Sequence, residues 1–300
     1  MKSKTCFILV GPTAVGKTDV AIQLAHKYST QIISADSRQC FNELNAGVAK
    51  PSPSQLNEVH HYFINSHSIH EDVNAITFEE YSLLNIEKIF ADSGHAVMVG
   101  GTGLYIKAFC EGLDTLPPID PDVRKKISST YQEMGFEWLH SEVEKKDSLY
   151  FSTGEIKNPQ RLMRALEVKI STGKSILDFQ SGKKKNRDFN IIKVGLELPR
   201  NELNARIDQR IDRMLASGLV EEARSLYSFK ELNALKTVGY RELFDFIDGT
   251  ISYDEAIMKI KTNTHRYAKR QMTWFKKDTE IVWKYPDEVS LHLDFLNPGL

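Results

Sequence analysis

The sequence predicts an α/β fold in which a parallel sheet is flanked by helices and carries an all-helical insertion. Three observations predict it. Short apolar segments alternate with helical patterns in the N-terminal part of the chain, as in a parallel sheet covered on both faces. A glycine-bounded turn joins the first apolar segment to a helix. From residue 122 to about residue 173 the pattern is helical, with no convincing strand.

The apolar segments place the strands, and the periodic ones place the helices. Strands are expected at Cys6–Val10, Gln31–Ala35, Ala96–Val99 and Ile191–Leu196, with His61–Ile64 as a further candidate. Helices are expected through Ala21, Leu24 and Ala25, over Phe78–Ala91, and from Tyr253 to about Lys276. Ile281–Trp283 is either a last strand or a docked tail.

Two polar or proline-rich stretches bound the helical insertion. Leu116–Pro118 and Asp120–Pro121 break the strand–helix rhythm, and the lysine-rich stretch Ser181–Asp188 precedes the next strand. We therefore expect a core of residues 1–118 and 191–300, with a helical insertion domain at 119–190.

Composition and charge narrow the classes of protein. A chain that is 41% apolar and 26% charged is typical of a globular domain. The formal net charge of −1 is not that of a globally basic nucleic-acid coat, so any RNA site must be a local basic cluster. Nothing in the sequence requires more than a monomer.

The cysteines and the apolar runs indicate a cytoplasmic protein with no membrane association. Cys6, Cys40 and Cys110 are odd in number and scattered, as in reduced proteins. The apolar run Cys6–Val10 is too short for a signal-peptide core, and no other stretch could span a bilayer. No histidine or cysteine spacing indicates zinc.

The turn after the first strand matches the phosphate-binding pattern G-x-x-x-x-G-K-[ST]. Its diphosphate-binding residues are Gly11, Pro12, Thr13, Ala14, Val15, Gly16, Lys17 and Thr18. Glycines let the backbone amides point inward, and the following helix adds the positive end of its dipole. Lys17 supplies a charge to the terminal phosphate, and Thr18 a hydroxyl ligand for Mg²⁺. The sequence thus predicts a P-loop NTPase-like core that binds a diphosphate-bearing ligand.

A P-loop alone most often means nucleotide chemistry, so a small-molecule or nucleotide kinase remains an alternative. Asp36 follows an apolar strand, where such enzymes carry a metal-associated carboxylate. Asp36 could equally cap the next helix, and Thr102, between glycines, could be a turn residue. A third alternative is a nucleotide-gated RNA-binding protein without catalysis.

The longer motifs resemble one family, the tRNA dimethylallyltransferases, also called tRNA isopentenyltransferases. They are G-P-T-A-V-G-K-T at 11–18, S-A-D-S-R-Q at 34–39, A-K-P at 49–51, V-G-G-T-G-L-Y at 99–105, N-P-Q-R-L-M-R-A-L-E-V at 158–168, V-G-Y-R-E at 238–242 and Y-A-K-R-Q-M-T-W-F at 267–275. The resemblance covers nearly the whole chain. One departure is Val48, where the family commonly has threonine.

The resemblance implies a reaction and the residues that catalyse it. Dimethylallyl diphosphate would lie in the P-loop, and N6 of the adenosine next to the anticodon, position 37, would attack its allylic carbon and expel diphosphate. Asp36 matches the general base, and Thr102 matches a residue that touches the target nucleotide. Lys17, the loop amides and Mg²⁺ on Thr18 would stabilise the leaving group. ATP is a further ligand that such a loop accepts.

The resemblance also implies which residues contact the anticodon stem-loop of tRNA. They are Asp36, Ser37, Arg38, Gln39, Thr102, Arg124, Gln160, Arg161, Leu162, Met163, Arg164, Lys236, Thr237, Val238, Gly239, Tyr240 and Arg241. The spacing of Arg161 and Arg164 places both on one helical face. Two other basic clusters, Lys183–Lys185 with Arg187 and the basic and aromatic residues of 266–277, are open to either RNA contact or an ordinary structural role.

Overall fold

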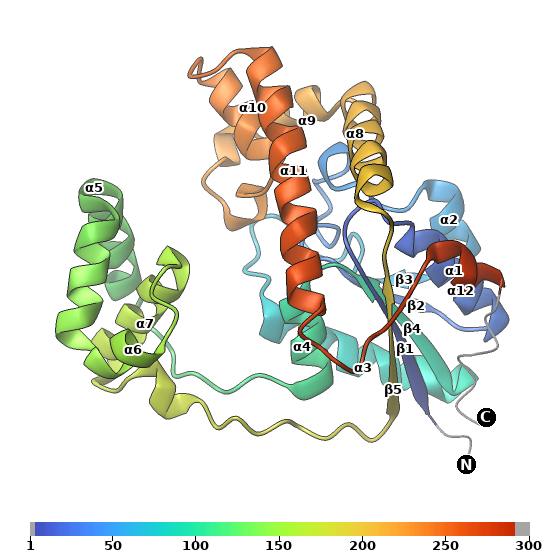
Figure 1. Cartoon of the computed structure of the whole chain (residues 1–300), viewed down its shortest axis with the longest axis horizontal. Coiled ribbons are helices and arrows are strands. Elements are labelled where there is room, and N and C mark those ends of the chain that lie inside the picture. Colours follow the sequence, from blue (N-terminus) through green and yellow to red (C-terminus); the bar gives the residue numbers. More distant parts are fainter. Residues whose placement is uncertain (1–3, 292–300) are drawn as a thin grey trace. The chain divides into compact units, whose positions relative to one another are not determined.

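A computed structural model describes residues 4–291 and places six parallel strands in one sheet (Figure 1). The strands are β1 (Thr5–Val10), β2 (Ile32–Ala35), β3 (His61–Tyr62), β4 (His95–Gly100), β5 (Asn190–Leu196) and β6 (Val282–Lys284), in the order β3-β2-β4-β1-β5-β6. Every residue of β1 and β2 is buried, as expected for central strands covered on both faces. The predicted P-loop NTPase-like architecture is confirmed.

The strand register brings three loops to one edge of the sheet. Val10 of β1 and Ala35 of β2 both pair with Gly100 of β4. The chain therefore leaves these three neighbouring strands at the same level. Because ligands of open α/β sheets bind beyond the carboxyl ends of the strands, this edge is where the site is expected.

Helices form layers against the sheet and extend the core. Figure 1 shows α1 and α12 on one side of the sheet and α4 and α11 on the other. The core helices are α1 (Lys17–Lys27), α2 (Pro53–Glu58), α3 (Ala75–Ser93), α4 (Gly103–Glu111), α8 (Arg200–Ala216), α9 (Leu219–Ser225), α10 (Tyr240–Ile247), α11 (Tyr253–Phe275) and α12 (Pro286–Leu291), with short 3-10 turns η1 (Ala46–Val48), η3 (Tyr227–Phe229) and η4 (Asn233–Leu235). Among the described residues, no helix combines the length and the apolar character needed to cross a membrane.

Of the two edge strands, β3 is shorter than predicted and β6 answers a question that the sequence left open. The segment expected as a strand at His61–Ile64 pairs only at its first two residues, because Phe63 and Asn65 have φ of 63° and 50°, and a strand cannot contain left-handed backbone. Ile281–Trp283, which was open between strand and tail, contributes to β6, which pairs with β5 from Val194↔Val282 onward.

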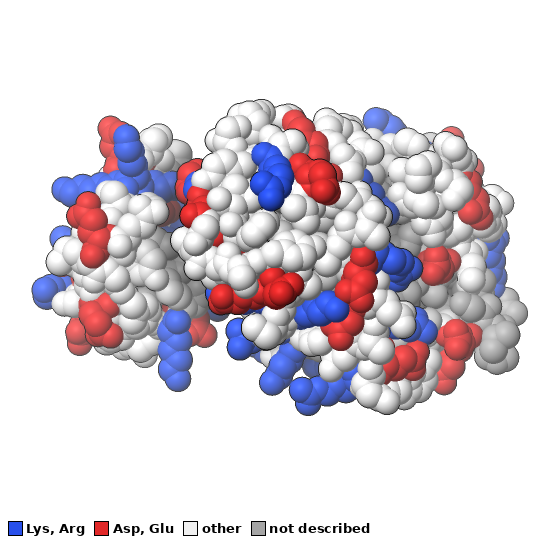
Figure 2. Space-filling view, turned by 90° about the horizontal axis from the view of Figure 1, so that it is seen from above, with Lys and Arg blue, Asp and Glu red and all other residues white. Residues whose placement is uncertain are grey.

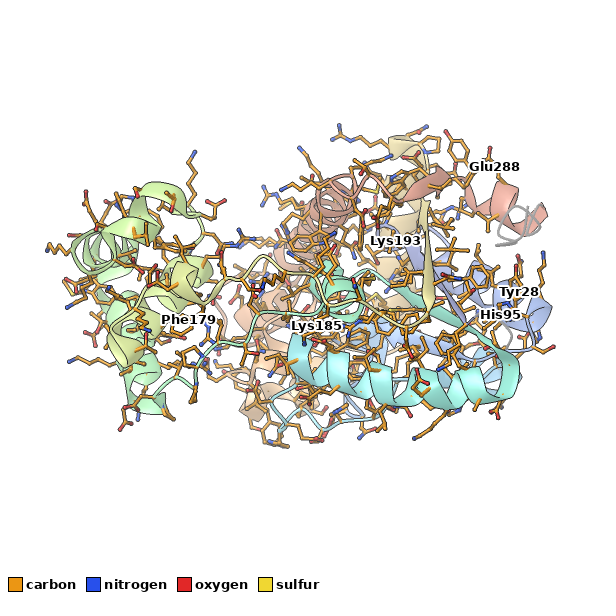
Figure 3. All side chains as sticks on the ribbon, turned by 90° about the horizontal axis from the view of Figure 1, so that it is seen from below. Tyr28, His95, Phe179, Lys185, Lys193 and Glu288 are labelled. Atoms are coloured by element: carbon orange, nitrogen blue, oxygen red, sulfur yellow. The ribbon has the colours of Figure 1, made fainter. Side chains whose placement is uncertain are left out.

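A buried lysine ties β5 to the loop before β6. Lys193 interrupts an otherwise apolar strand, and its Nζ donates to Asp278 and Glu280 at 2.8 Å each. Burial lowers the pKa of Lys193, but these two carboxylates outweigh it and raise the pKa. Figure 3 labels Lys193 on β5. It also labels Tyr28 and His95, and the rings of these two residues stack with centroids 4.8 Å apart. Paired charge is what permits a lysine at this depth.

The chain divides into two compact units, and the second one, residues 113–185, is all-helical. It contains α5 (Pro121–Lys146), α6 (Ser148–Thr153), α7 (Pro159–Thr172) and η2 (Ile176–Phe179), drawn in green in Figure 1. Leu139, Val143 and Leu162 are fully buried in its own core. The division falls at 112/113 and 185/186, where the sequence indicated 118/119 and 190/191. The proline-rich 116–118 stretch thus lies inside the second unit.

Candidate active site

The P-loop has the backbone that a phosphate cradle requires. It runs from the end of β1 to Lys17, where α1 begins. Gly11 and Gly16 have φ of 146° and 102°, which side-chain-bearing residues rarely adopt. A Cβ on Gly11 would lie 2.5 Å from the Leu196 carbonyl oxygen, so position 11 also needs glycine for space. Ala14 takes φ of 66° without that freedom.

Lys17 lies inside the loop, where neighbouring groups shift its pKa in opposite directions. Its Nζ donates to the Pro12 carbonyl oxygen at 2.6 Å. Burial, together with the nearby Arg210 charge, lowers the pKa of Lys17 to about 7, and the Asp36 carboxylate opposes that shift. A phosphate placed in the loop would add negative charge beside the ammonium and favour its protonated form.

Asp36 presents a carboxylate with one engaged and one unengaged oxygen. Its Oδ1 accepts hydrogen bonds from the amides of Arg38 at 2.8 Å and Gln39 at 3.2 Å. Asp36 therefore caps a turn and not a helix, since the next helical element begins only at Ala46. Within residues 4–291 no hydrogen bond is recorded to Oδ2. The turn thus fixes the carboxylate through Oδ1 and leaves Oδ2 available to a ligand.

Thr102 joins the loop after β4 to the loop after β2. Its Oγ1 accepts from the Ser37 amide at 3.1 Å, and its own amide donates to the Ala35 carbonyl at 3.2 Å. The Thr102 hydroxyl can still donate its own proton to a further acceptor. A Cβ on Gly100 would lie 2.1 Å from the Ala35 carbonyl oxygen, so only glycine permits this approach of the two strand ends.

The P-loop and Asp36 line one cavity of about 1110 Å³. Lys17, Thr18, Asp36 and Gln39 border it, with residues of α8, α9 and α11. Its size suits a diphosphate together with a second, flat reactant. A fixed carboxylate beside a phosphate cradle can accept a proton while a diphosphate leaves.

Comparison with known proteins decides the family. The model of the IPP transferase family matches residues 39–278. A tRNA dimethylallyltransferase of Cytophaga hutchinsonii is 44% identical over 99% of this chain and 98% of its own, and that of Christiangramia forsetii is 46% identical over 95% and 94%. The chain belongs to the tRNA dimethylallyltransferase family. Neither the kinase nor the non-catalytic alternative gains any support.

Solved structures agree with that assignment. The tRNA isopentenylpyrophosphate transferase of Bacillus halodurans has a TM-score of 0.71 and 30% identity, over 97% of this chain and 94% of that one. A eukaryotic dimethylallyltransferase acting on tRNA shares the fold, with a TM-score of 0.75 at 23% identity, over 94% of this chain and 74% of that one.

Arginines of α8 border the cavity, although none of the sequence motifs indicated them. They are Arg206, Arg210 and Arg213. The Arg206 Nη1 lies 3.7 Å from where a Cβ on Gly16 would sit. Burial lowers the pKa of Arg210, and the charge of the Asp36 carboxylate opposes that shift. The spacing of these arginines along one helical face was the available signal.

Two residues of α11 complete this site. Gln271 is buried, accepts from the Thr13 amide at 2.9 Å and donates to the Gly101 carbonyl at 3.0 Å. It therefore ties the P-loop to the Gly-Gly-Thr loop. Burial, reinforced by Asp36, raises the pKa of Tyr267 to about 12, so its phenol remains a hydrogen-bond donor. Both residues lie in the 267–275 motif, but the motif alone did not indicate what either side chain does.

Apart from Thr102, the segments that the resemblance predicts to contact tRNA fall in three places. Ser37, Arg38 and Gln39 follow β2, Lys236–Arg241 run from just after η4 into α10, and Arg124 and residues 160–164 lie in the second unit. Gln39 is engaged internally, since its side chain accepts from Ser34 Oγ and donates to the Val48 and Ala49 carbonyls.

Several side chains in these segments are structural. Leu162 and Tyr240 are 0% exposed, and Met163 packs against the core of the second unit. Their side chains thus leave RNA contact to exposed neighbours such as Arg161. On the face of the molecule in Figure 2, positive and negative side chains are interspersed.

Glu167 holds two of the predicted RNA-contacting arginines. Its Oε2 lies 3.2 Å from Arg164 Nη1 and 3.6 Å from Arg124 Nε. The Glu167 side chain is only 11% exposed, whereas that of Arg124 is 57% exposed. The carboxylate thus pairs with both guanidinium groups, while the Arg124 side chain stays largely exposed.

The donor set fits Mg²⁺ held mainly by substrate. Among the described residues, no group of three or more histidine, cysteine, aspartate or glutamate side chains could form a protein cage for a metal. Thr18 borders the same cavity as Asp36. Mg²⁺ is usually held by one or two protein oxygens, substrate phosphates and water. A single threonine hydroxyl beside a phosphate-binding loop is consistent with that coordination.

Proposed function

We propose that this chain transfers a dimethylallyl group from dimethylallyl diphosphate to N6 of adenosine 37, next to the anticodon of tRNA. The observation that carries the proposal is the fixed Asp36 carboxylate, with Oδ2 unengaged, in the cavity that also holds the P-loop. A family member with that arrangement has a base and a diphosphate site within one enclosure.

The donor diphosphate would lie on the P-loop amides at the N-terminus of α1. Lys17 and the α8 arginines Arg206 and Arg210 face the same enclosure and would neutralise the charge that grows on the leaving diphosphate. Such pre-organised groups cost no reorganisation when the bond breaks. Mg²⁺ held by the Thr18 hydroxyl and the phosphate oxygens would supply further Lewis-acid stabilisation.

The chemical step needs a proton acceptor because the adenine amine is a weak nucleophile. The N6 lone pair forms the new C–N bond, the allylic C–O bond breaks, and diphosphate leaves with the electron pair. Asp36 Oδ2 accepts the N6 proton. Thr102, whose oxygen already accepts from Ser37, would donate its hydroxyl hydrogen to the adenine. A positioned base contributes about 10²–10⁴-fold.

The target adenine must leave the stacked anticodon loop to reach Asp36. Exposed basic residues of the proposed contact segments, such as Arg38, Arg124 and Arg161, would hold the surrounding phosphates. The positions of these basic residues, and not the total charge of the chain, would decide tRNA binding, because the chain carries a formal net charge of −1. We propose that a monomer suffices, since all of these groups lie in one chain.

Product analysis tests this function. Purified protein, Mg²⁺, dimethylallyl diphosphate and unmodified tRNA should yield N6-(dimethylallyl)adenosine, detected by nucleoside mass spectrometry. A tRNA with guanosine at position 37 serves as the matched control and should give no product. If the adenosine-37 tRNA also gives none while a known dimethylallyltransferase modifies it, the proposal is wrong. Turnover of ATP with a small acceptor would favour kinase chemistry instead.

A further inference from the structure

A carboxylate that is not part of any sequence motif holds the backbone beside the active-site cavity. Glu222 in α9 accepts hydrogen bonds from three consecutive amides, those of Asn45 and Ala46 at 2.9 Å and Gly47 at 3.0 Å. It also accepts from the Tyr240 hydroxyl at 2.5 Å. Burial and Glu222 itself raise the pKa of Tyr240, so the phenol stays protonated and keeps donating.

Close packing makes this arrangement specific. Tyr240 is fully buried in α10, and a Cβ on Gly47 would lie 2.4 Å from its ring and hydroxyl. The loop therefore rests directly on the tyrosine. The residue two positions along the loop, Ala49, has φ of 45°. A non-glycine residue in this conformation persists only when its surroundings hold it there.

The held loop, residues 45–49, in turn contacts side chains at the catalytic end of the sheet. The Val48 carbonyl accepts from Arg210 Nη2 and from Gln39 Nε2, both at 3.4 Å. The Ala49 carbonyl accepts from Gln39 Nε2 at 3.1 Å. Arg210 is the guanidinium whose charge acts on both Lys17 and Asp36. Displacement of the loop would therefore move Arg210 relative to the P-loop.

We propose that Glu222 and Tyr240 form a latch that positions Arg210 at the donor diphosphate through residues 45–49. The inference rests on the proposed function, because it assumes that a diphosphate occupies the P-loop. Glu222 and Tyr240 are positioning residues, since neither is required to touch substrate. The role also explains why the V-G-Y-R-E motif contains a tyrosine whose side chain cannot reach RNA.

The latch predicts a specific kinetic signature. Loosening it misplaces one diphosphate ligand and leaves Arg124, Arg161 and Arg164, which lie in the second unit, unchanged. The KM for dimethylallyl diphosphate should therefore rise, and kcat should fall, while the KM for tRNA stays within about twofold. Misplacement of a catalytic group by about 1 Å can cost about 100-fold. A purely structural role would lower the melting temperature and the folded fraction, with unchanged constants per folded molecule.

Two substitutions and a matched control test the latch. Tyr240→Phe keeps the ring and removes one hydrogen bond, and we expect about a 10-fold fall in kcat/KM for the donor. Glu222→Gln keeps the shape but replaces an acceptor oxygen with a donor, and we expect about a 100-fold fall. Glu221→Gln changes an exposed neighbour on the same helix and should match the parent chain. Rates are normalised to folded protein measured by circular dichroism.

A double-mutant cycle shows whether Glu222 acts through Arg210. Glu222→Gln should have an effect of less than about twofold in an Arg210→Ala background, because coupled residues are not additive. The latch is excluded if both single variants keep the donor KM and kcat of the parent, or if the Glu222 and Arg210 effects multiply independently. An inactive parent chain would instead refute the proposed function, so the two failures are distinguishable.

Discussion

At the scale of single residues, the site depends on groups whose charge is set by their neighbours. Burial and the nearby Arg210 charge lower the pKa of Lys17 to about 7, against the opposing charge of Asp36. A fraction of this lysine is then uncharged at neutral pH until a phosphate arrives. Asp36, by contrast, is fixed by two backbone amides and keeps one oxygen for chemistry.

Donor binding should therefore take up a proton. A phosphate next to Lys17 raises the lysine pKa above 7, so between the free and bound pKa values binding draws a proton from the buffer. At pH 8 we expect the calorimetric heat of binding to change with the ionisation enthalpy of the buffer. Lys17→Met should remove this dependence. Buffer-independent heats for the parent chain at pH 8 would contradict the argument.

Thr102 should act through its hydroxyl. Thr102→Ser keeps the oxygen and is expected to retain most turnover, whereas Thr102→Val keeps the shape and should lose about 10-fold or more, the order expected for one hydrogen bond to a reacting group. Single-turnover rates at saturating tRNA measure the difference. Equal rates for the serine and valine variants would show that the hydroxyl touches nothing in the reaction.

At the scale of elements, helices α8 and α11 complete a site whose motifs lie mainly on loops. Gln271 of α11 joins the Thr13 amide to the Gly101 carbonyl. If it is replaced by an apolar residue, these two backbone groups lose their partner in a buried setting. The helix thus holds the P-loop against the loop that contains Thr102.

Gln271→Leu should destabilise the fold and impair catalysis together. Each buried backbone group left without a partner costs about 1–3 kcal/mol, so with two such groups we expect the free energy of unfolding to fall by about 2–6 kcal/mol in urea titration. The donor KM should rise as well. Met258→Ala, on an exposed position of the same helix, is the control. A Gln271→Leu variant as stable and active as this control would show that the hydrogen bonds of Gln271 to the two loops do not matter.

Elements that form through local interactions were predicted from the sequence, whereas features that depend on partners distant in sequence were not. β1, β4, β5 and the P-loop depend on local apolar runs and on glycine spacing, and the sequence predicted each of them. β3 came out shorter because Phe63 is left-handed. Arg210 and Glu222 could not be assigned roles, because their partners Val48 and Gly47 lie far away in sequence. The resemblance indicated Asp36 and Thr102, whose neighbours are now seen.

At the scale of the whole molecule, a nearly neutral chain has to bind a polyanion. The formal net charge is −1, so long-range attraction to tRNA is weak and local arginines have to supply the contacts. Glu167 pairs with Arg124 and Arg164, and this pre-orientation would lower the conformational entropy lost in the phosphate contacts that we propose for them. RNA affinity should accordingly depend on few residues and on salt.

Arg161→Ala should weaken tRNA binding and flatten its salt dependence. Loss of one phosphate contact reduces the slope of log K against log salt by about 1. Filter binding between 50 and 200 mM salt, a window in which phosphate contacts dominate, measures both quantities. Lys157→Ala, an exposed basic residue of the same unit, is the comparison. An unchanged slope for Arg161→Ala would place this arginine outside the RNA interface.

The central claim is that the Asp36 carboxylate accepts the proton of the adenine amine, and one measurement tests it most directly. Single-turnover prenyl transfer is followed with enzyme in excess over tRNA and saturating donor, for the parent chain and for Asp36→Asn. The asparagine can still cap the turn with its side-chain oxygen but cannot act as a base. We predict a rate about 10²–10⁴-fold lower with the tRNA dissociation constant changed less than about twofold. Equal rates, or a loss that weaker tRNA binding explains fully, would contradict the mechanism.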